Sequence, residues 1–240
     1  MKRNLYLLMV IFLAGGTVLA QPKFSDPNVQ PREAKNFTAI KVSGAFDVYI
    51  TQSEEEALAV SAAEQKYLSQ VKTEVKDGVL RIWYDAGSLK SWNTGKMKLK
   101  AYISFKDISR LQVGGACDVY VQGKIKLDNL KIDASGASDI KEGAWEIGKL
   151  SVDMSGASDV KMSGTVGKIS VEASGASDFS GYNLVADYGD FKASGASDIQ
   201  ITVVKEFSAE ASGSSDIRYK GSGMIKDVKT SGSSSISRRS

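Results

Sequence analysis

One short stretch decides the fold, and the chain repeats it: residues 131–140 read KIDASGASDI, and residues 151–160 read SVDMSGASDV. The SGASD core begins at positions 135, 155, 174 and 194, and the variants SGSSD and SGSSS begin at 212 and 231. Neighbouring motif glycines are 18 to 21 residues apart, and a period near 20 predicts a solenoid with one repeat per coil. The corner glycines are Gly115, Gly136, Gly156, Gly175, Gly195, Gly213 and Gly232.

Each repeat has the pattern of two strands. Residues two, four and six before the glycine are mostly apolar, as in Leu130, Ile132 and Ala134, and the residues between them are polar. A period of two predicts strands with one buried face. Another apolar residue, such as Ile140, follows four positions after the glycine. The two strands would meet at a Ser-Gly-Ala-Ser corner, where glycine allows a positive φ or a close backbone approach.

Two architectures fit this unit: parallel coils stacked as a β-helix, or successive antiparallel hairpins with Gly-Ala as a tight turn. The near identity of neighbouring units favours the β-helix, because equivalent residues would then lie one above another, about 4.8 Å apart. We predict an all-β fold with a parallel β-helix of about seven coils over residues 111–240.

The first twenty residues are typical of a cleaved secretory signal peptide. Lys2 and Arg3 precede the apolar stretch Leu5–Leu13, and small residues lead to a cleavage site after Ala20. Residues 21–33 are expected to form a flexible leader. No later run approaches the roughly 18 apolar residues of a membrane span. The chain is therefore expected to be exported and to be periplasmic, cell-surface or secreted.

Residues 34–110 are less regular. The sequence FDVYI at 46–50 resembles CDVYV at 117–121, but the glycines before them are 71 residues apart, which is too far for one coil. Strand patterns at 57–61, 72–84 and 97–105, a hairpin turn at Asp77-Gly78 and a short helix within 62–70 fill this segment. We interpret it as a β-rich cap that protects the first coil's edge.

Composition excludes much chemistry. The 240 residues contain no histidine and one cysteine, Cys117. Ser-His-Asp and Cys-His catalysis, zinc sites built from cysteine and histidine, and an intramolecular disulfide are therefore impossible. Without the signal peptide the chain has 29 basic and 28 acidic residues, so nucleic acid is not a favoured partner. No Walker loop, dinucleotide fingerprint or Gly-x-Ser-x-Gly elbow is present, and no cofactor is expected.

The corner motifs and the segment FDVYITQ at 46–52, after a signal peptide, resemble the family of putative autotransporter adhesins with a head GIN domain. The resemblance covers residues 35–236. It implies a right-handed single-stranded β-helix, similar to pectin-lyase folds without their catalytic residues, and a role in adhesion. We expect a non-enzymatic binding module for a glycan or surface protein. The sequence leaves both a monomer and an oligomer open. The alternatives are a carbohydrate-active enzyme and a self-assembling structural solenoid.

One column of aspartates follows the corners. Each precedes an inward apolar residue, so the carboxylates should lie outside and repel one another by roughly 1 kcal/mol per pair in water. They could form a calcium ladder, or they could accept hydrogen bonds within the corners, which we favour because the spacing of known calcium solenoids is missing. No metal is therefore expected. The column contains Asp118, Asp139, Asp159, Asp178, Asp198 and Asp216.

Aromatic residues in the connections between coils are candidates for ligand binding. Trp92 lies in a glycine-flanked loop, and Trp145, Tyr182 and Tyr188 fall in the variable connections, where solenoids often carry function. Their rings could stack on sugars or on partner side chains. The alternative is that they pack over the ends of the interior, which is favoured for Trp145 more than for Trp92.

Overall fold

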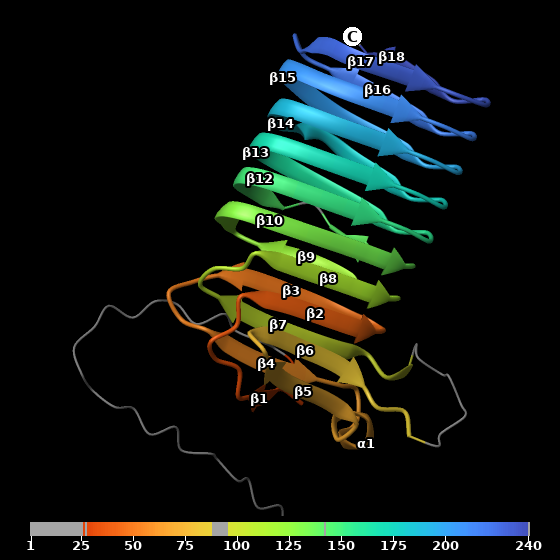
Figure 1. Cartoon of the computed structure of the whole chain (residues 1–240). Coiled ribbons are helices and arrows are strands. Elements are labelled where there is room, and N and C mark those ends of the chain that lie inside the picture. The colour runs from red at the N-terminus through yellow and green to blue at the C-terminus, as the bar shows by residue number, and fades with distance from the viewer. Residues whose placement is uncertain (1–25, 27, 88–95, 142, 240) are drawn as a thin grey trace, which may run out of the picture.

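The computed structural model describes residues 26, 28–87, 96–141 and 143–239, and its secondary structure is nearly all β, with 68% of the residues in strands and 2% in a helix. Figure 1 shows the strands stacked as successive layers along one axis, with the C-terminus at one end of the stack. The predicted signal peptide lies outside the described residues.

In the described ranges the strands follow one another along the chain with one short helix among them. The elements of the N-terminal part are β1 (Gln30–Arg32), β2 (Ala39–Gly44), β3 (Phe46–Gln52), β4 (Ala57–Ser61), α1 (Gln65–Leu68), β5 (Val71–Lys76), β6 (Val79–Tyr84) and β7 (Leu99–Phe105). Those of the repeat array are β8 (Arg110–Gly115), β9 (Asp118–Gln122), β10 (Lys124–Gly136), β11 (Asp139–Ile140), β12 (Ala144–Met154), β13 (Asp159–Ala173), β14 (Asp178–Ala193), β15 (Asp198–Ala211), β16 (Asp216–Lys220), β17 (Met224–Thr230) and β18 (Ser235–Arg238).

Successive coils pair in parallel and in the register of the repeat. Leu130 lies beside Leu150, and Leu150 lies beside Ile169, each one coil further along. The same parallel pairing continues from β13 through β14 to β15 and β17. The hairpin alternative is therefore wrong, and the predicted β-solenoid is confirmed. The seven corner glycines from Gly115 to Gly232 bound about six full turns. The expected number of about seven coils equals the number of corners, which is one more than the number of full turns between them.

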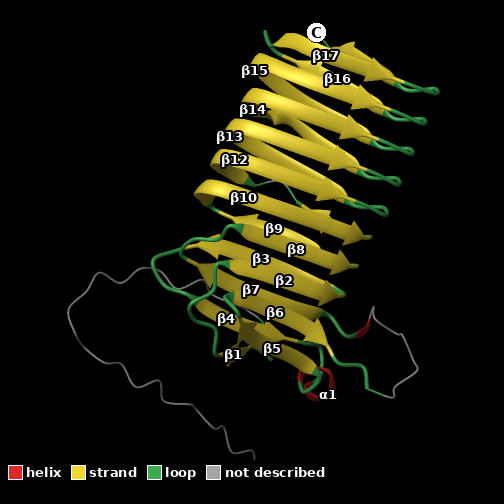
Figure 2. Cartoon of the chain, viewed as in Figure 1, coloured by secondary structure: helices red, strands yellow, loops and turns green. Residues whose placement is uncertain are grey.

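Glycine is required at the corners for two reasons. All seven corner glycines have φ between 73° and 94°, a region that other residues avoid. A Cβ atom on Gly156 would also lie 2.4 Å from the carbonyl oxygen of Gly136, the corner glycine one coil earlier. The corners thus stack backbone on backbone, and Figure 2 shows them as a row of loops along one side of the sheet stack.

The predicted inward positions form the core. Leu130, Ile132 and Ala134 are buried, as are the equivalent residues of the later coils down to Ala211 except Gly189, which is partly exposed. On the other side of the corner Ile140 and its equivalents are buried from Val119 to Ile217. The apolar interior therefore runs the length of the stack, which confirms the alternation read from the sequence.

The N-terminal part is interleaved with the repeat array. β2 pairs in parallel with β6 on one side and with β8 on the other, and β3 lies in the same way between β7 and β9. Residues 39–52 thus form a layer between two layers that come later in the chain. Most of the chain between the two similar segments forms a layer on the far side of β2 and β3. This layer explains why the glycines of the two segments are 71 residues apart.

Antiparallel pairing completes this part of the chain. β4 pairs with β7, and β5 with β6, through the predicted Asp77-Gly78 turn, in which both residues have positive φ. The helix expected within 62–70 is α1. One expectation is corrected: Gln30–Arg32 form β1, which pairs with β4, so these residues are not part of a flexible leader. They pair because β4 offers a free edge.

Candidate functional site

The corners project as a ridge, and a column of buried serines stabilises it. At the Gly136 corner, the Ser138 hydroxyl donates to the Ser135 carbonyl oxygen at 3.0 Å and accepts the Cys117 N–H of the preceding coil at 3.4 Å. The same pair of hydrogen bonds repeats at Ser177, while Ser158 makes the bond within its corner and Ser197 accepts the bond from the preceding coil. A buried hydroxyl of this column can therefore close its own corner and also join it to a neighbouring coil. The fully buried serines are Ser138, Ser158, Ser177, Ser197 and Ser215.

The lone cysteine belongs to this column. Cys117 stands two residues after Gly115, where later coils have serine, and its thiol lies 3.5 Å from the carbonyl oxygen of Gly114. Burial raises the pKa of the Cys117 thiol to about 11. A buried thiol that is protonated at neutral pH is a poor nucleophile, so Cys117 is a packing residue.

The aspartates form the outer column that the sequence predicts. Register places Asp118 beside Asp139, Asp139 beside Asp159, and so on to Asp216. Cations offset the charge at both ends of this column. Lys141 Nζ lies 3.2 Å from Asp118 and 2.6 Å from Asp139, and Arg218 binds both Asp198 and Asp216.

The interpretation of the aspartates as corner caps stays a prediction, since the buried serines also make hydrogen bonds within the corners. Some aspartates do accept hydrogen bonds from the next coil: Asp178 accepts the N–H of Asp198 at 3.3 Å, Asp216 accepts the hydroxyl of Ser235 at 2.6 Å, and Asp159 accepts the N–H of Asp178. In the middle of the column, burial and the neighbouring charges of Asp139 and Asp178 raise the pKa of Asp159. The described ranges contain no group of three His, Cys, Asp or Glu side chains placed to hold a metal ion.

Two grooves flank the corner ridge. The larger has a volume of about 450 Å³ and runs across five coils on the side where the strands enter the corners. Acidic side chains, one lysine and a series of serines line it. Its polar lining consists of Asp133, Asp153, Glu172, Lys192, Glu210, Ser135, Ser155, Ser174, Ser194 and Ser212. We call it the serine groove.

Ion pairs hold most carboxylates of the serine groove. Arg110 Nε lies 2.8 Å from Asp133, Lys131 pairs with Asp153, and Lys192 Nζ lies 3.1 Å from Glu172. The groove thus offers a regular array of fixed acceptors and hydroxyl groups, repeated once per coil. The second groove, of about 400 Å³, lies on the other side of the ridge over Asp139, Asp159 and Asp178.

Among the aromatic candidates, Trp145 is corrected by the structure. Its side chain is only 1% exposed, because it packs inward beside Ile125 and Gly164 in the stack. It cannot contact a ligand at the surface, and the alternative of interior packing holds for it. Trp92 lies outside the described residues.

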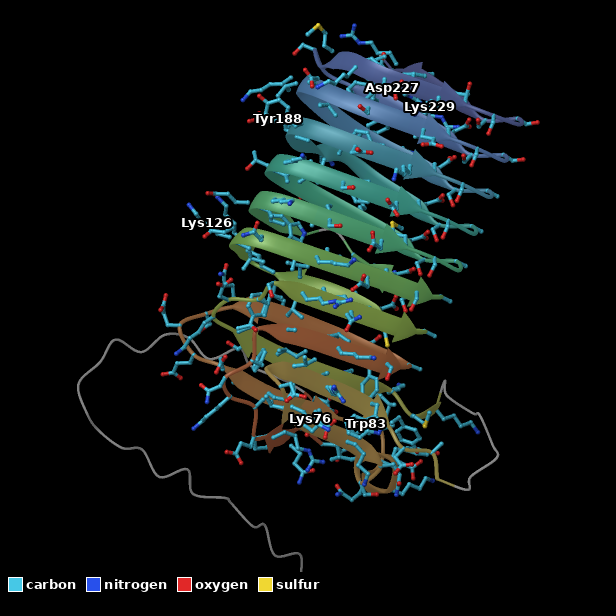
Figure 3. All side chains as sticks on the ribbon, in the orientation of Figure 1. Lys76, Trp83, Lys126, Tyr188, Asp227 and Lys229 are labelled. Atoms are coloured by element: carbon cyan, nitrogen blue, oxygen red, sulfur yellow. The ribbon has the colours of Figure 1, made fainter. Side chains whose placement is uncertain are left out.

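The two tyrosine candidates lie at or near the bend opposite the corners, and both rings are at least partly exposed. Tyr188 is 45% exposed, and Lys205 Nζ lies 5.3 Å from its ring centroid. Tyr182 is half-buried, and Lys220 Nζ lies 5.0 Å from its ring centroid. Figure 3 shows Tyr188 and Lys126 on the side of the stack away from the corner loops. They are thus separate from the serine groove.

Sequence reasoning missed a ladder of three tyrosines. Tyr49 stacks on Tyr102 and on Tyr120, with ring centroids 5.1 and 5.0 Å apart and planes tilted by 16°. The rings lie outward on β7, β3 and β9, and burial is the main cause of the raised pKa of Tyr102 and Tyr120. The signal was the repeated Asp-Val-Tyr at 47–49 and 118–120. Because the faces stack on one another, the ladder mainly stabilises the interleaved layers.

These features define a class: a β-solenoid with an interleaved cap, a ridge of glycine corners and polar grooves. The chain belongs to the family described as "Putative auto-transporter adhesin, head GIN domain", whose model matches residues 36–223. No curated protein matches the chain. Within the described residues no helix is long and apolar enough to cross a membrane.

Solved structures share the fold. A protein from Bacteroides fragilis, described as a putative adhesin, is 25% identical, with a TM-score of 0.81 over 88% of this chain and 96% of that one. A protein from Parabacteroides distasonis, described as a putative lipid binding protein, is 19% identical, with a TM-score of 0.65 over 90% and 98%. A putative adhesin from Parabacteroides merdae is 17% identical, with a TM-score of 0.66 over 90% and 97%.

Proposed function

We propose that this protein is an exported, non-enzymatic adhesion module that binds an extended glycan along the serine groove. The observation that carries the proposal is the groove's periodic lining, with one carboxylate or ammonium group and one serine per coil. Sugar hydroxyl groups donate to carboxylates and exchange hydrogen bonds with serine, so a linear glycan could repeat one set of contacts from coil to coil. Family membership supports an adhesive role.

Binding fits the groove better than catalysis does. Glycoside hydrolysis needs two carboxylates with distinct roles, one acidic and one basic or nucleophilic. The carboxylates of the serine groove instead repeat in equivalent positions, and Asp133, Asp153 and Glu172 are held in ion pairs. Fixed, equivalent acceptors suit recognition of a repeating ligand.

Binding of a partner protein is the second candidate function, and the exposed side chain of Tyr188 favours it. Tyrosine is enriched in protein interfaces, and this ring with Lys205 forms a small aromatic and cationic surface at the bend. Tyr182 would contribute its partly exposed ring. Replacing Tyr188 with alanine separates the two sites, because it should leave binding in the serine groove unchanged.

A glycan array followed by calorimetry tests the proposal. Ser155 is exposed at the wall of the groove, so Ser155→Arg should fill the groove and weaken binding at least tenfold. The matched control is Thr165→Arg, which adds the same side chain at an exposed position on the opposite bend and should bind as wild type. Equal glycan binding by both variants would show that the glycan does not bind in the serine groove. Cleavage of a bound polysaccharide by the wild type would favour the enzyme instead.

A further inference from the structure

The C-terminal end of the solenoid is open. Within the described part of the chain, β17 pairs with β15 and β18 with β16, and neither has a strand on its outer side. Ile225 and Val228 point inward like Phe207 and Ala209 of the coil below, yet each is 43% exposed. An open strand edge beside uncovered apolar side chains is a surface that another strand can cover.

The other end carries the usual protection against strand pairing. β1 is three residues long and contains Pro31, which lacks an N–H group to donate. β5 has charged Lys72, Glu74 and Lys76 on one face, and α1 lies at this end with Leu68 buried beneath it. Figure 2 shows α1 at the end of the stack opposite to β17.

We propose that the open end binds a second copy of this chain, edge to edge, as a closed two-fold pair. The sequence of β17 is complementary to itself when the copies run antiparallel and are centred on Val228. In that register Asp227 lies opposite Lys229 of the second copy, and Lys229 lies opposite its Asp227. Both side chains point outward, since they pair with outward Ser208 and Glu210. On the inner face, Val228 lies opposite Val228 of the second copy.

The same two-fold axis also suits β18. Val228 stands four residues before Gly232 and Ile236 four residues after it, so the two lie at matching heights on the two sides of the corner. The axis that centres β17 on Val228 therefore centres β18 on Ile236. Ser235 then lies opposite Ser237 of the second copy, and no two like charges meet.

The Arg238 side chain does not block this contact. Its guanidinium donates to the carbonyl oxygen of Gly221 at 2.7 Å and is thus directed toward the preceding coil. The backbone N–H of Arg239 also donates to that coil, to the carbonyl oxygen of Tyr219 at 2.8 Å. Because each copy has one open end and one protected end, the contact closes after two copies and does not extend into a filament.

Light scattering coupled to gel filtration tests the pairing. Wild-type protein should have the mass of two chains at high concentration and should dissociate on dilution. Asp227→Lys alone and Lys229→Asp alone should each have the mass of one chain, since each places like charges opposite each other twice. An equimolar mixture of the two variants should pair again, because the lysine introduced at position 227 of one variant would face the aspartate introduced at position 229 of the other. The double variant should also pair with itself.

Asp187→Lys is the matched control. It removes a comparable surface ion pair, between Lys205 and Asp187 at 2.9 Å, on a bend away from the open edge, and it should remain paired. Melting curves establish that each variant is folded, and Val228→Asp provides a second disruption that does not depend on the ion pairs. A wild type that stays a single chain, a filament, or a mixture of the variants that does not pair would overturn the proposal.

Discussion

At the residue scale, each corner glycine meets two separate requirements, a positive φ and the absence of a Cβ atom. Gly123 meets only the first: its φ is 77°, and nothing lies within 4 Å of the position of a Cβ atom. Gly156 meets both, since its Cβ would overlap the backbone of Gly136. The two glycines therefore separate strain from crowding.

Gly156→Val is expected to destabilise the protein by about 4 kcal/mol or more, and Gly123→Val by about 1–3 kcal/mol. The difference arises because the carbonyl oxygen of Gly136 belongs to the backbone of a stacked corner and cannot move aside alone. Urea unfolding of both variants measures it. Similar losses in the two variants would show that stacking adds nothing to the cost of the dihedral angle.

The serine column predicts a second asymmetry. Ser177→Ala should cost about 1–3 kcal/mol, because it removes the acceptor of the Ser158 N–H and the donor to the Ser174 carbonyl inside the structure. Ser151→Ala, on the outer face of β12, should change stability by less than about 0.5 kcal/mol. Thermal melts compare them, and equal effects would remove the special role of the buried hydroxyl.

The sequence already contained the information that separates the serines from the aspartates. Ser138 and Ile140 are two residues apart, so a period of two puts both inside, and Asp139 between them outside. The corner hydrogen bonds could therefore have been assigned to serine from parity alone. The turn preference of aspartate points to the other residue, but that preference does not say which side of the strand the side chain occupies.

At the scale of the element, the aspartate column is a set of stacked like charges with cations near its two ends. Lys141 and Arg218 each join two coils, and Asp159 lies between them among carboxylates. This arrangement raises the question of whether the aspartate column also needs a cation from solution. We expect that calcium or a chelator will not shift the melting temperature, because no three carboxylates converge in the described residues.

A calcium titration followed by differential scanning calorimetry makes this measurement. Bound calcium would add about 2.7 kcal/mol at a hundredfold excess over its Kd, which amounts to several degrees. Such a rise in the wild type, absent in Asp159→Asn, would assign the column to a metal. Magnesium at equal ionic strength controls for general screening.

The pH dependence of Asp159 has a definite sign. Its pKa is raised in the folded state, so the folded protein holds this proton more tightly, and the resulting stabilisation is present at low pH and lost as the pH rises through the folded pKa. Asp159→Asn should therefore raise the melting temperature at pH 7 by about 1–2 °C. The advantage should vanish as the pH falls toward 3.8, the ordinary pKa of aspartate. A variant less stable than wild type at pH 7 would contradict the assignment.

At the scale of the whole molecule, neighbouring layers differ in how many partners they have. β2, β3, β12, β13 and β14 each have strands on both sides, whereas β17 and β18 have one. Hydrogen exchange at low protein concentration should therefore be faster in residues 224–238 than around β3 and β9. Raising the concentration should protect residues 224–238 if two copies pair there. Uniform protection along the axis would contradict this gradient.

Repetition explains how much of the molecule could be predicted. Corners and strands of the array repeat in one register, so parity and spacing were enough. The bends vary, and the pairing shifts between Lys161 and Ser163 and between Gly181 and Val185, so parity fails near them. Trp145 is buried although it lies five residues after buried Ile140, so an alternation continued from the corner would place it outside. The interleaved layers could not be predicted because they depend on pairing between segments distant in the chain.

The interleaving of β2 and β3 also sets an order of events for a chain that emerges with its N-terminus first. These strands are made early, but their partners on both sides, β6 to β9, are complete only at Gln122. The first layer therefore waits until about half of the chain is available, because its contacts are non-local. From β10 onward each coil can add to a finished edge as soon as it appears. Growth of the solenoid is thus delayed and then sequential, and among the described coils the one formed by β17 and β18 is the last to emerge.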